Sequence, residues 1–235
     1  MKSATQYYLM AFIAVIPILL IELGSENNNV REEAKTEIKE KLKEKWEKLN
    51  DESNKKSNQT YAFPFEVKCK ENSLIIDYQA NINLKNLNDE QKSSFMLGKY
   101  NFEEVPIGKM VCISLEYIID NLLKKNMSKT IITGTCDNTP LKDKITYKGE
   151  FGENLSIPYY NITTNKESTM TFHIDKKLSD NYEFALLRAY SVFYYFKENG
   201  IPITIENTEF EIKQINEEGK RYCDFSITFE NYFKD

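Results

Sequence analysis

The segment Ile131-Ile132-Thr133-Gly134-Thr135-Cys136-Asp137-Asn138-Thr139-Pro140 is the part of the chain that decides its fold. Its β-branched start predicts a short strand, Gly134 predicts a break in that strand, and Asp137 falls in a turn that Pro140 closes. A carboxylate at the end of a strand stands on a rigid support, which is a common way to present a binding group. The segment therefore predicts a ligand-binding turn with Asp137 at its tip.

A second segment, Asn181-Tyr182-Glu183-Phe184-Ala185-Leu186-Leu187-Arg188-Ala189, opens a predicted helix. We expect Asn181 to be its N-cap and the helix to run to Asn199, before Gly200-Ile201-Pro202 ends it. Asn181 and Arg188 are seven residues apart, so they lie on almost the same face two turns apart. A polar residue and a guanidinium on one helix face make a second candidate binding element.

Together the two segments resemble the OmpA/MotB-like peptidoglycan-binding domain. That family shows Gly-His-Thr-Asp, often followed by Asn-Thr-Pro, at a strand end, and begins its next helix with Asn-Trp-Glu-Leu-Ser-x-x-Arg-Ala. This chain replaces the His, Thr, Trp, Leu and Ser of those motifs with Thr135, Cys136, Tyr182, Phe184 and Ala185. The resemblance implies an α/β (α+β sandwich) fold, an OmpA-like βαβαβ domain with an inserted hairpin, across residues 61–235.

The same resemblance implies a ligand, the peptidoglycan stem peptide, bound through its diaminopimelate. That group carries an ammonium and a carboxylate on one short side chain. Asp137 would accept from the ammonium, and Arg188 would hold the carboxylate as a bidentate fork. Asn181, Thr139 and Arg221 match supporting polar positions of the family's pocket. A structural salt bridge between Asp137 and Arg188 is the alternative, and the two roles do not exclude each other.

Composition narrows the function classes further. The chain has 235 residues and a net charge of −5, so it offers no basic field for nucleic acid or anionic lipid. Four cysteines, Cys69, Cys112, Cys136 and Cys223, are widely spaced without a CxxC pair, so no zinc site, metal or cofactor is expected. We expect free thiols packed as small apolar residues rather than disulfides.

Catalytic constellations are not visible in the sequence. The single histidine, His173, stands without a cluster of acids or cysteines at ligand spacing, and we interpret it as a plain strand residue. No general acid–base pair or nucleophile triad can be assembled around it. The sequence therefore predicts a protein that is not an enzyme, and a wall hydrolase is the weakest of the hypotheses.

The N-terminal apolar run Tyr7–Leu23 predicts an uncleaved single-pass membrane anchor within residues 1–25. A cleaved signal peptide with Lys2 as its charged end is the alternative. The resemblance to a wall-binding domain implies the inner (cytoplasmic) membrane, with the C-terminal domain in the periplasm. Glu22 is a candidate ion carrier, although an acid at the end of such a run also suits a hydrated carboxylate at the interface.

Residues 26–60 are predicted to form a charged amphipathic helix and a linker. The helix spans Val30–Asp51, and residues 51–60 are polar and small, as in a linker. Its narrow apolar stripe consists of Val30, Ala34, Ile38, Leu42, Trp46 and Leu49. The spacing does not fit a long left-handed coiled coil. Two alternatives stay open: a solvated spacer helix, or a helix whose stripe packs on a partner, either its own copy or the membrane face.

Periodicity predicts the remaining elements. The expected strands are Phe65–Cys69, Ser73–Asn83, part of Phe95–Phe102, Thr130–Thr133, Phe210–Gln214 and Tyr222–Phe229. A helix is expected from Pro106 to Lys125, with Val111, Leu115 and Ile118 in its apolar stripe. Residues 141–177 are expected to hold an inserted hairpin that contains the strands Ile145–Phe151 and Thr169–Ile174.

Two functional hypotheses follow from the anchor and the resemblance. The first is the wall-anchoring B subunit of a MotA/MotB-like ion-driven motor, flagellar or of the Zorya antiviral defence type. It would act as a stator leg, a homodimer beside a multi-pass MotA-like subunit. The second is a stand-alone envelope protein that tethers the inner membrane to the wall without ion transport. MotB-like stator subunits carry an Asp well inside the anchor helix, and Tyr7–Leu23 has none.

Overall fold

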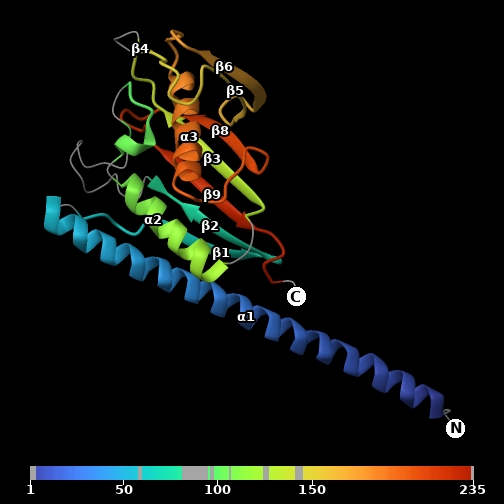
Figure 1. The fold of residues 1–235 in the computed structure, drawn as a ribbon. Coiled ribbons are helices and arrows are strands. Elements are labelled where there is room, and N and C mark those ends of the chain that lie inside the picture. Colours follow the sequence, from blue (N-terminus) through green and yellow to red (C-terminus); the bar gives the residue numbers. More distant parts are fainter. Residues whose placement is uncertain are drawn as a thin grey trace.

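The computed structural model describes residues 4–57, 60–80, 95, 98–105, 107–123, 127–140 and 145–233. Side chains are described from Asn28 onward, except those of residues 56, 57, 121 and 122. Within this part of the chain a seven-stranded mixed sheet has the order β1-β2-β9-β3-β8-β5-β6, and a small second sheet pairs β4 with β7 (Figure 1).

The strands are β1 (Phe65–Lys70), β2 (Ser73–Tyr78), β3 (Lys129–Cys136), β4 (Ile145–Thr146), β5 (Asn154–Asn161), β6 (Lys166–His173), β7 (Lys177–Leu178), β8 (Thr208–Gln214) and β9 (Cys223–Phe229). The helices are α1 (Ala4–Ser57), the 3-10 turn η2 (Phe102–Glu104), α2 (Gly108–Ile118), the π-helical turn η3 (Ile119–Leu123) and α3 (Asn181–Glu198).

Helices cover one face of the large sheet and leave the other open (Figure 1). Along β9 the burial alternates, because Cys223, Phe225, Ile227 and Phe229 point into the helix-covered core while the residues between them are half-exposed. β3 and β8 are parallel neighbours, and the chain between them forms β4 to β7 and then α3. β9 runs antiparallel between β2 and β3. The predicted fold class, a mixed α/β sandwich, is confirmed.

Most predicted elements are present with shifted ends. In β2, Leu74, Ile76 and Tyr78 are buried as the alternation predicts, but the strand ends at Tyr78, and residues 81–83 lie outside the described part. The described residues of Phe95–Phe102 contain no strand; Phe102 opens η2 instead. Val111, Leu115 and Ile118 are buried in α2 as expected, while Pro106 is outside the description.

Gly134 lies inside β3 and does not break it, contrary to the sequence prediction. A Cβ built at Gly134 would stand 1.9 Å from the carbonyl oxygen of Ala185 in α3. The residue is therefore a close-approach glycine that lets the helix backbone reach the strand. Because the strand continues to Cys136, Asp137 is the first residue after it.

The predicted hairpin is present within the described residues 145–177, where β5 pairs with β6, but its strands differ from the prediction. Ile145–Phe151 contributes only the two-residue strand β4, whereas β5 (Asn154–Asn161) was missed. Pro158 argued against a strand there, since proline is confined to edges and bulges. The hairpin is not a separate excursion either, because β5 also pairs with β8 of the main sheet.

The stripe of α1 packs on this chain's own domain, an outcome that neither sequence alternative contained. Ile38, Leu42 and Trp46 are at most 2 % exposed. The Trp46 indole N–H donates to the Tyr61 carbonyl (3.3 Å), and its ring meets Phe65 of β1 edge-on at 5.9 Å. Figure 1 shows α1 running along α2 and β1 and continuing past the domain toward the N-terminus.

The polar segment expected as a linker also differs, since α1 continues through Ser57. No helix in the described part of the chain is long and apolar enough to span a membrane. The side chains of the predicted anchor, residues 1–25, lie outside the described part of the chain, and so does the side chain of Glu22.

The cysteine prediction is confirmed, because all four thiols are free and three of them, Cys112, Cys136 and Cys223, are buried. Burial raises the pKa of the Cys112 and Cys136 thiols to about 12, so they stay protonated at neutral pH. His173 is the last residue of β6, a strand position as predicted.

Candidate functional site

Asp137 is 1 % exposed although it lies in a turn. Its Oδ2 accepts from the Arg221 guanidinium (Nη1, 2.6 Å) and from the backbone N–H of Gly219 (2.7 Å). Its Oδ1 accepts from the backbone N–H of Thr139 (3.2 Å). The carboxylate thus joins the end of β3 to the β8–β9 turn, and all of these donors favour its charged form.

The pKa of Asp137 reflects a contest between burial and these donors. Burial alone would raise the pKa, because a dry environment disfavours the charged carboxylate. The Gly219 N–H, the Arg221 charge and Thr139 act in the opposite direction and hold the pKa below its ordinary value. Asp137 is therefore ionised at neutral pH.

Asn181 brings the two sequence motifs together. Its side-chain Nδ2 donates to the carbonyls of Asp137 (2.9 Å) and Thr139 (3.1 Å). The predicted N-cap role belongs to Asp180 instead, whose carboxylate accepts from the Tyr182 N–H and forms a capping box with Glu183. Asn181 is thus free to use its amide on the turn, and the first turn of α3 is fixed against the end of β3.

Arg188 lies in the core beneath this turn and is 2 % exposed. Its Nε donates to the Lys99 carbonyl (2.9 Å) and its Nη1 to the Thr135 carbonyl (3.0 Å). Two rings flank the guanidinium, with its carbon 5.5 Å from the Phe95 centroid and 5.8 Å from that of Phe184. Burial lowers the pKa of Arg188 to about 10, so it remains cationic at neutral pH.

The ion pair at this end of the sheet joins Asp137 to Arg221. Arg188, the partner in the alternative salt bridge considered from the sequence, donates to backbone carbonyls instead. Arg221, with its side chain 18 % exposed, also donates from Nε to the Phe95 carbonyl (3.2 Å). The structure therefore gathers Asp137, Thr139, Asn181 and Arg221 by direct contact. Arg188 lies behind them, held by backbone carbonyls.

A surface hollow of about 530 Å³ adjoins this cluster at the start of α3. It is lined by Pro140, Ser179, Asp180 and Asn181. A small polar ligand placed there would meet the N-terminal end of the helix and the 137–140 turn.

Two groups of this cluster were missed at the sequence level. The Gly219 N–H has no side-chain signature, and the charged run at residues 216–220 indicates only that a turn lies there. Phe95 lies far from the motifs in sequence, and its backbone N–H donates to the Arg221 carbonyl (2.6 Å). Neither contact can be predicted from the spacing of residues in the sequence. Both depend on how the residues just before β9 fold over the end of β3.

Two solved structures with a similar arrangement are a MotB-like protein and the periplasmic domain of a MotB. A MotB-like protein from Desulfovibrio vulgaris aligns with 86 % of this chain and 96 % of its own, at 11 % identity and a TM-score of 0.40. The periplasmic domain of Helicobacter pylori MotB aligns with 73 % of this chain and 87 % of its own, at 14 % identity and a TM-score of 0.35.

No protein-family model matches the chain, and no curated protein matches it.

Proposed function

We propose that this chain is a non-catalytic peptidoglycan-binding protein, anchored in the inner membrane by residues 1–25, whose domain binds the stem peptide on the periplasmic side. The observation that carries the proposal is the clamp by Asn181, whose amide donates to the carbonyls of Asp137 and Thr139. It places the Asp-Asn-Thr-Pro turn and the Asn-Tyr-Glu helix start in one cluster, as a wall-binding site requires.

The chemistry of the cluster suits a small zwitterion. Asp137 would accept from the diaminopimelate ammonium, which would take the place of the Arg221 guanidinium on Oδ2. Arg221, released from Asp137, can then bind the ligand's carboxylate as a fork. Each charge keeps a partner of opposite sign in this exchange, because the ligand's ammonium pairs with Asp137 and its carboxylate pairs with Arg221. Rigid supports, a strand end and a helix start, keep the ordering cost of binding low.

Arg188 is the second guanidinium proposed for the ligand's carboxylate. It is enclosed by Phe95 and Phe184, so direct contact with a ligand requires Phe95 to move. Without that movement Arg188 still contributes a fixed positive charge beneath the turn.

Cosedimentation of the full-length chain, kept in detergent, with purified insoluble peptidoglycan tests the proposal. The full chain is needed because Ile38, Leu42 and Trp46 of α1 are part of the domain core. We expect the wild type to sediment with the wall, and Asp137→Ala, Arg188→Ala and Arg221→Ala to stay in the supernatant. The exposed variants Glu153→Ala and Lys197→Ala serve as charge controls. Equal sedimentation of all five variants would refute wall binding at this cluster.

The finer proposal is that the chain is the wall-anchoring B subunit of a MotA/MotB-like ion-driven motor, flagellar or Zorya-type. It would form a homodimer beside a multi-pass subunit, with Glu22 as the candidate ion carrier. The absence of an Asp within Tyr7–Leu23 favours the second candidate, a stand-alone tether without ion transport. Purification of the full-length chain from native membranes decides between them, since only a motor subunit brings a multi-pass partner with it.

A further inference from the structure

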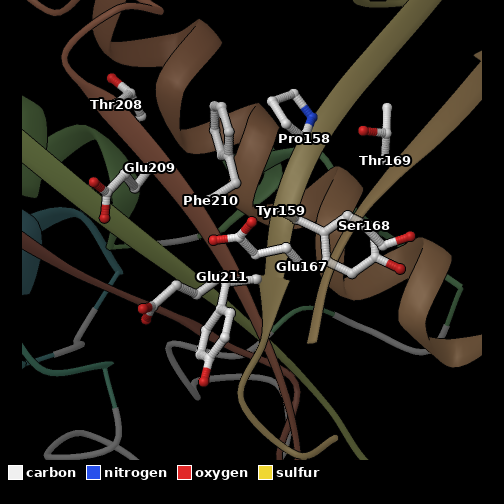
Figure 2. A pocket seen from close by; sticks show the side chains of 10 residues that line it. Pro158, Tyr159, Glu167, Ser168, Thr169, Thr208, Glu209, Phe210 and Glu211 are labelled. Atoms are coloured by element: carbon white, nitrogen blue, oxygen red, sulfur yellow. The ribbon is translucent and has the colours of Figure 1, made fainter. Parts of the chain in front are cut away.

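β5 and β8 are neighbours in the main sheet, yet they pair only at Tyr160↔Glu211 and Asn161↔Ile212. Toward their N-terminal ends the strands separate around a hollow of about 630 Å³ (Figure 2). We name this hollow the β5–β8 wedge and define it by the residues Pro158, Tyr160, Glu167, Thr208, Glu209, Phe210 and Glu211. Its volume falls in the range of ligand pockets, about 300–1,000 Å³.

Backbone groups of β8 face the wedge without a ladder partner. In a parallel pair, alternate residues direct both N–H and C=O to the same neighbouring strand. The Ile162 N–H donates to the Ile212 carbonyl (3.0 Å), so Ile212 and Phe210 direct their groups toward β5, and so does Thr208. The register ends at Tyr160, which leaves the Phe210 N–H and the Thr208 carbonyl unpaired in the ladder.

Pro158 explains why the two strands do not close. Continued pairing would require an N–H at position 158 to donate to the Thr208 carbonyl, and proline has none. Thr208 is held from the other side, since its N–H and its hydroxyl donate to carbonyls of the preceding turn, those of Ile205 (3.4 Å) and Thr204 (2.6 Å). The gap is therefore fixed by covalent structure and by the turn.

Carboxylates stand around the opening on the uncovered face of the sheet. Glu167 comes from β6, and Glu209 and Glu211 come from β8; Figure 2 shows Glu167 reaching from β6 toward the β8 side. Glu211 accepts from the Thr133 hydroxyl (2.8 Å), and Glu209 pairs with Lys129 (2.8 Å). The Glu209–Lys129 pair is exposed and contributes little, so these carboxylates can accept another cation.

Proline and charge also protect the outer edges of sheets from unwanted pairing. The charges of Lys166 and Glu167 fit that explanation in β6, the outer strand at this end of the sheet order. The explanation does not fit the gap between β5 and β8, which lies inside the order, where two neighbouring strands would otherwise pair with each other. An interior opening with free backbone groups suits an added strand.

We propose that the β5–β8 wedge binds an extended segment of a partner protein, which adds as a strand along β8 and carries Lys or Arg at alternate positions. The unpaired N–H of Phe210 and carbonyl of Thr208 supply the main-chain bonds. Alternate side chains of the segment point to one face, where Glu167, Glu209 and Glu211 receive the cations.

The wedge is remote from the wall-binding cluster and independent of it. Asn138, next to Asp137, contacts Gln214 at the C-terminal end of β8, whereas the wedge begins at Thr208 at the opposite end. Variants of one site therefore leave the other intact, and the two proposals fail or succeed separately.

A labelled peptide probe, acetyl-Lys-Val-Lys-Thr-Lys-Val-Lys-amide, tests the proposal by fluorescence anisotropy with the full-length chain in detergent. A second peptide has the same charges but N-methylated Val and Thr residues, which removes their backbone donors. We expect the first peptide to bind and to slow hydrogen exchange at the Phe210 N–H, and the methylated peptide to bind about tenfold more weakly or less. No binding of the first peptide, or equal binding of both, would overturn the proposal.

Variants of the protein locate the site. We expect the double variant Glu209→Gln/Glu211→Gln to weaken binding about tenfold and Pro158→Val, which restores an N–H for the Thr208 carbonyl, to abolish it. The control Glu103→Gln/Glu198→Gln carries the same charge change on the helix-covered side and is expected to bind as the wild type does. Thermal melting establishes that each variant is folded. Wild-type affinity in both folded wedge variants would contradict the assignment.

Discussion

Asp137 stabilises the fold in the absence of any ligand, because its carboxylate joins three donors from two loops. We expect Asp137→Asn to lower the free energy of unfolding by about 2–3 kcal/mol at pH 7, since a buried charge pair loses one partner. The folded pKa lies below the unfolded one, so this stability is present above about pH 4 and is lost as the pH falls through the folded pKa.

Urea unfolding of wild type and Asp137→Asn at pH 7 and pH 3 checks this expectation. The difference between the two proteins should be largest at pH 7 and should shrink at pH 3. A variant as stable as the wild type at pH 7 would show that the cluster does not hold the β3 end to the β8–β9 turn.

Asp224 behaves in the opposite way. Burial raises its pKa to about 6, despite the Ala80 N–H that donates to Oδ1 (2.8 Å). Because the folded state binds the proton more tightly than the unfolded chain, stability falls as the pH rises from about 4 to 6. We expect Asp224→Asn, which keeps the acceptor for Ala80, to stabilise the protein by about 1–2 kcal/mol at pH 8 and to have little effect at pH 4. Melting temperatures across this range measure it, and a constant difference at both pH values would contradict it.

The role of Gly134 could not be predicted from the sequence. Its position before a turn suggested a strand break, yet its function is to admit the Ala185 carbonyl of α3. A Cβ at 1.9 Å from that backbone atom cannot be relieved by a side-chain rotation. We therefore expect Gly134→Ala to cost at least about 3 kcal/mol of unfolding free energy in thermal or urea denaturation. A cost below about 1 kcal/mol would mean that α3 and β3 are not in this contact.

At the scale of elements, α1 belongs to the domain core although its composition is that of a solvated helix. Trp46→Ala is expected to lower the free energy of unfolding by about 3–5 kcal/mol, because a large buried ring is replaced by a cavity. Val30→Ala, at a position of the same stripe that is 56 % exposed, should stay within about 0.5 kcal/mol. Urea unfolding compares the two variants, and equal small effects would contradict the packing of α1 on α2 and β1.

Periodicity in the sequence predicted the elements that bury one face and expose the other. β2, β8, β9, α2 and α3 were expected from alternation or from a 3.6-residue repeat, and all are present. β5 was missed because it contains Pro158, a residue that is rare inside strands. Its N-terminal part is not paired with β8 and borders the wedge. The packing of α1 was missed because the stripe specifies a buried face and leaves its partner unspecified.

For the whole molecule, the sequence motifs brought Asp137, Thr139 and Asn181 together correctly, because a strand end and the next helix start are adjacent in this fold class. The motifs did not predict that Arg221 forms the ion pair with Asp137. Which arginine reaches Asp137 depends on the fold of the β8–β9 turn, and that turn places Arg221 on the carboxylate and leaves Arg188 in the core.

The molecule thus offers two separate surfaces at opposite ends of β8. One end holds the Asp137 cluster, proposed for the wall, and the other holds the β5–β8 wedge, proposed for an extended basic segment. α1 lies against neither, since it packs on α2 and β1 (Figure 1). The two surfaces and the α1 interface therefore occupy different parts of the domain.

Isothermal titration of the full-length chain with soluble stem peptides is the most direct test of the central claim, a zwitterion held between a carboxylate and a guanidinium. A tripeptide that ends in diaminopimelate is compared with one that has lysine in its place, which keeps the ammonium and lacks the side-chain carboxylate. We predict that the diaminopimelate peptide binds and that the lysine peptide binds at least about tenfold more weakly. Equal affinities for the two peptides, or no heat from either, would contradict it.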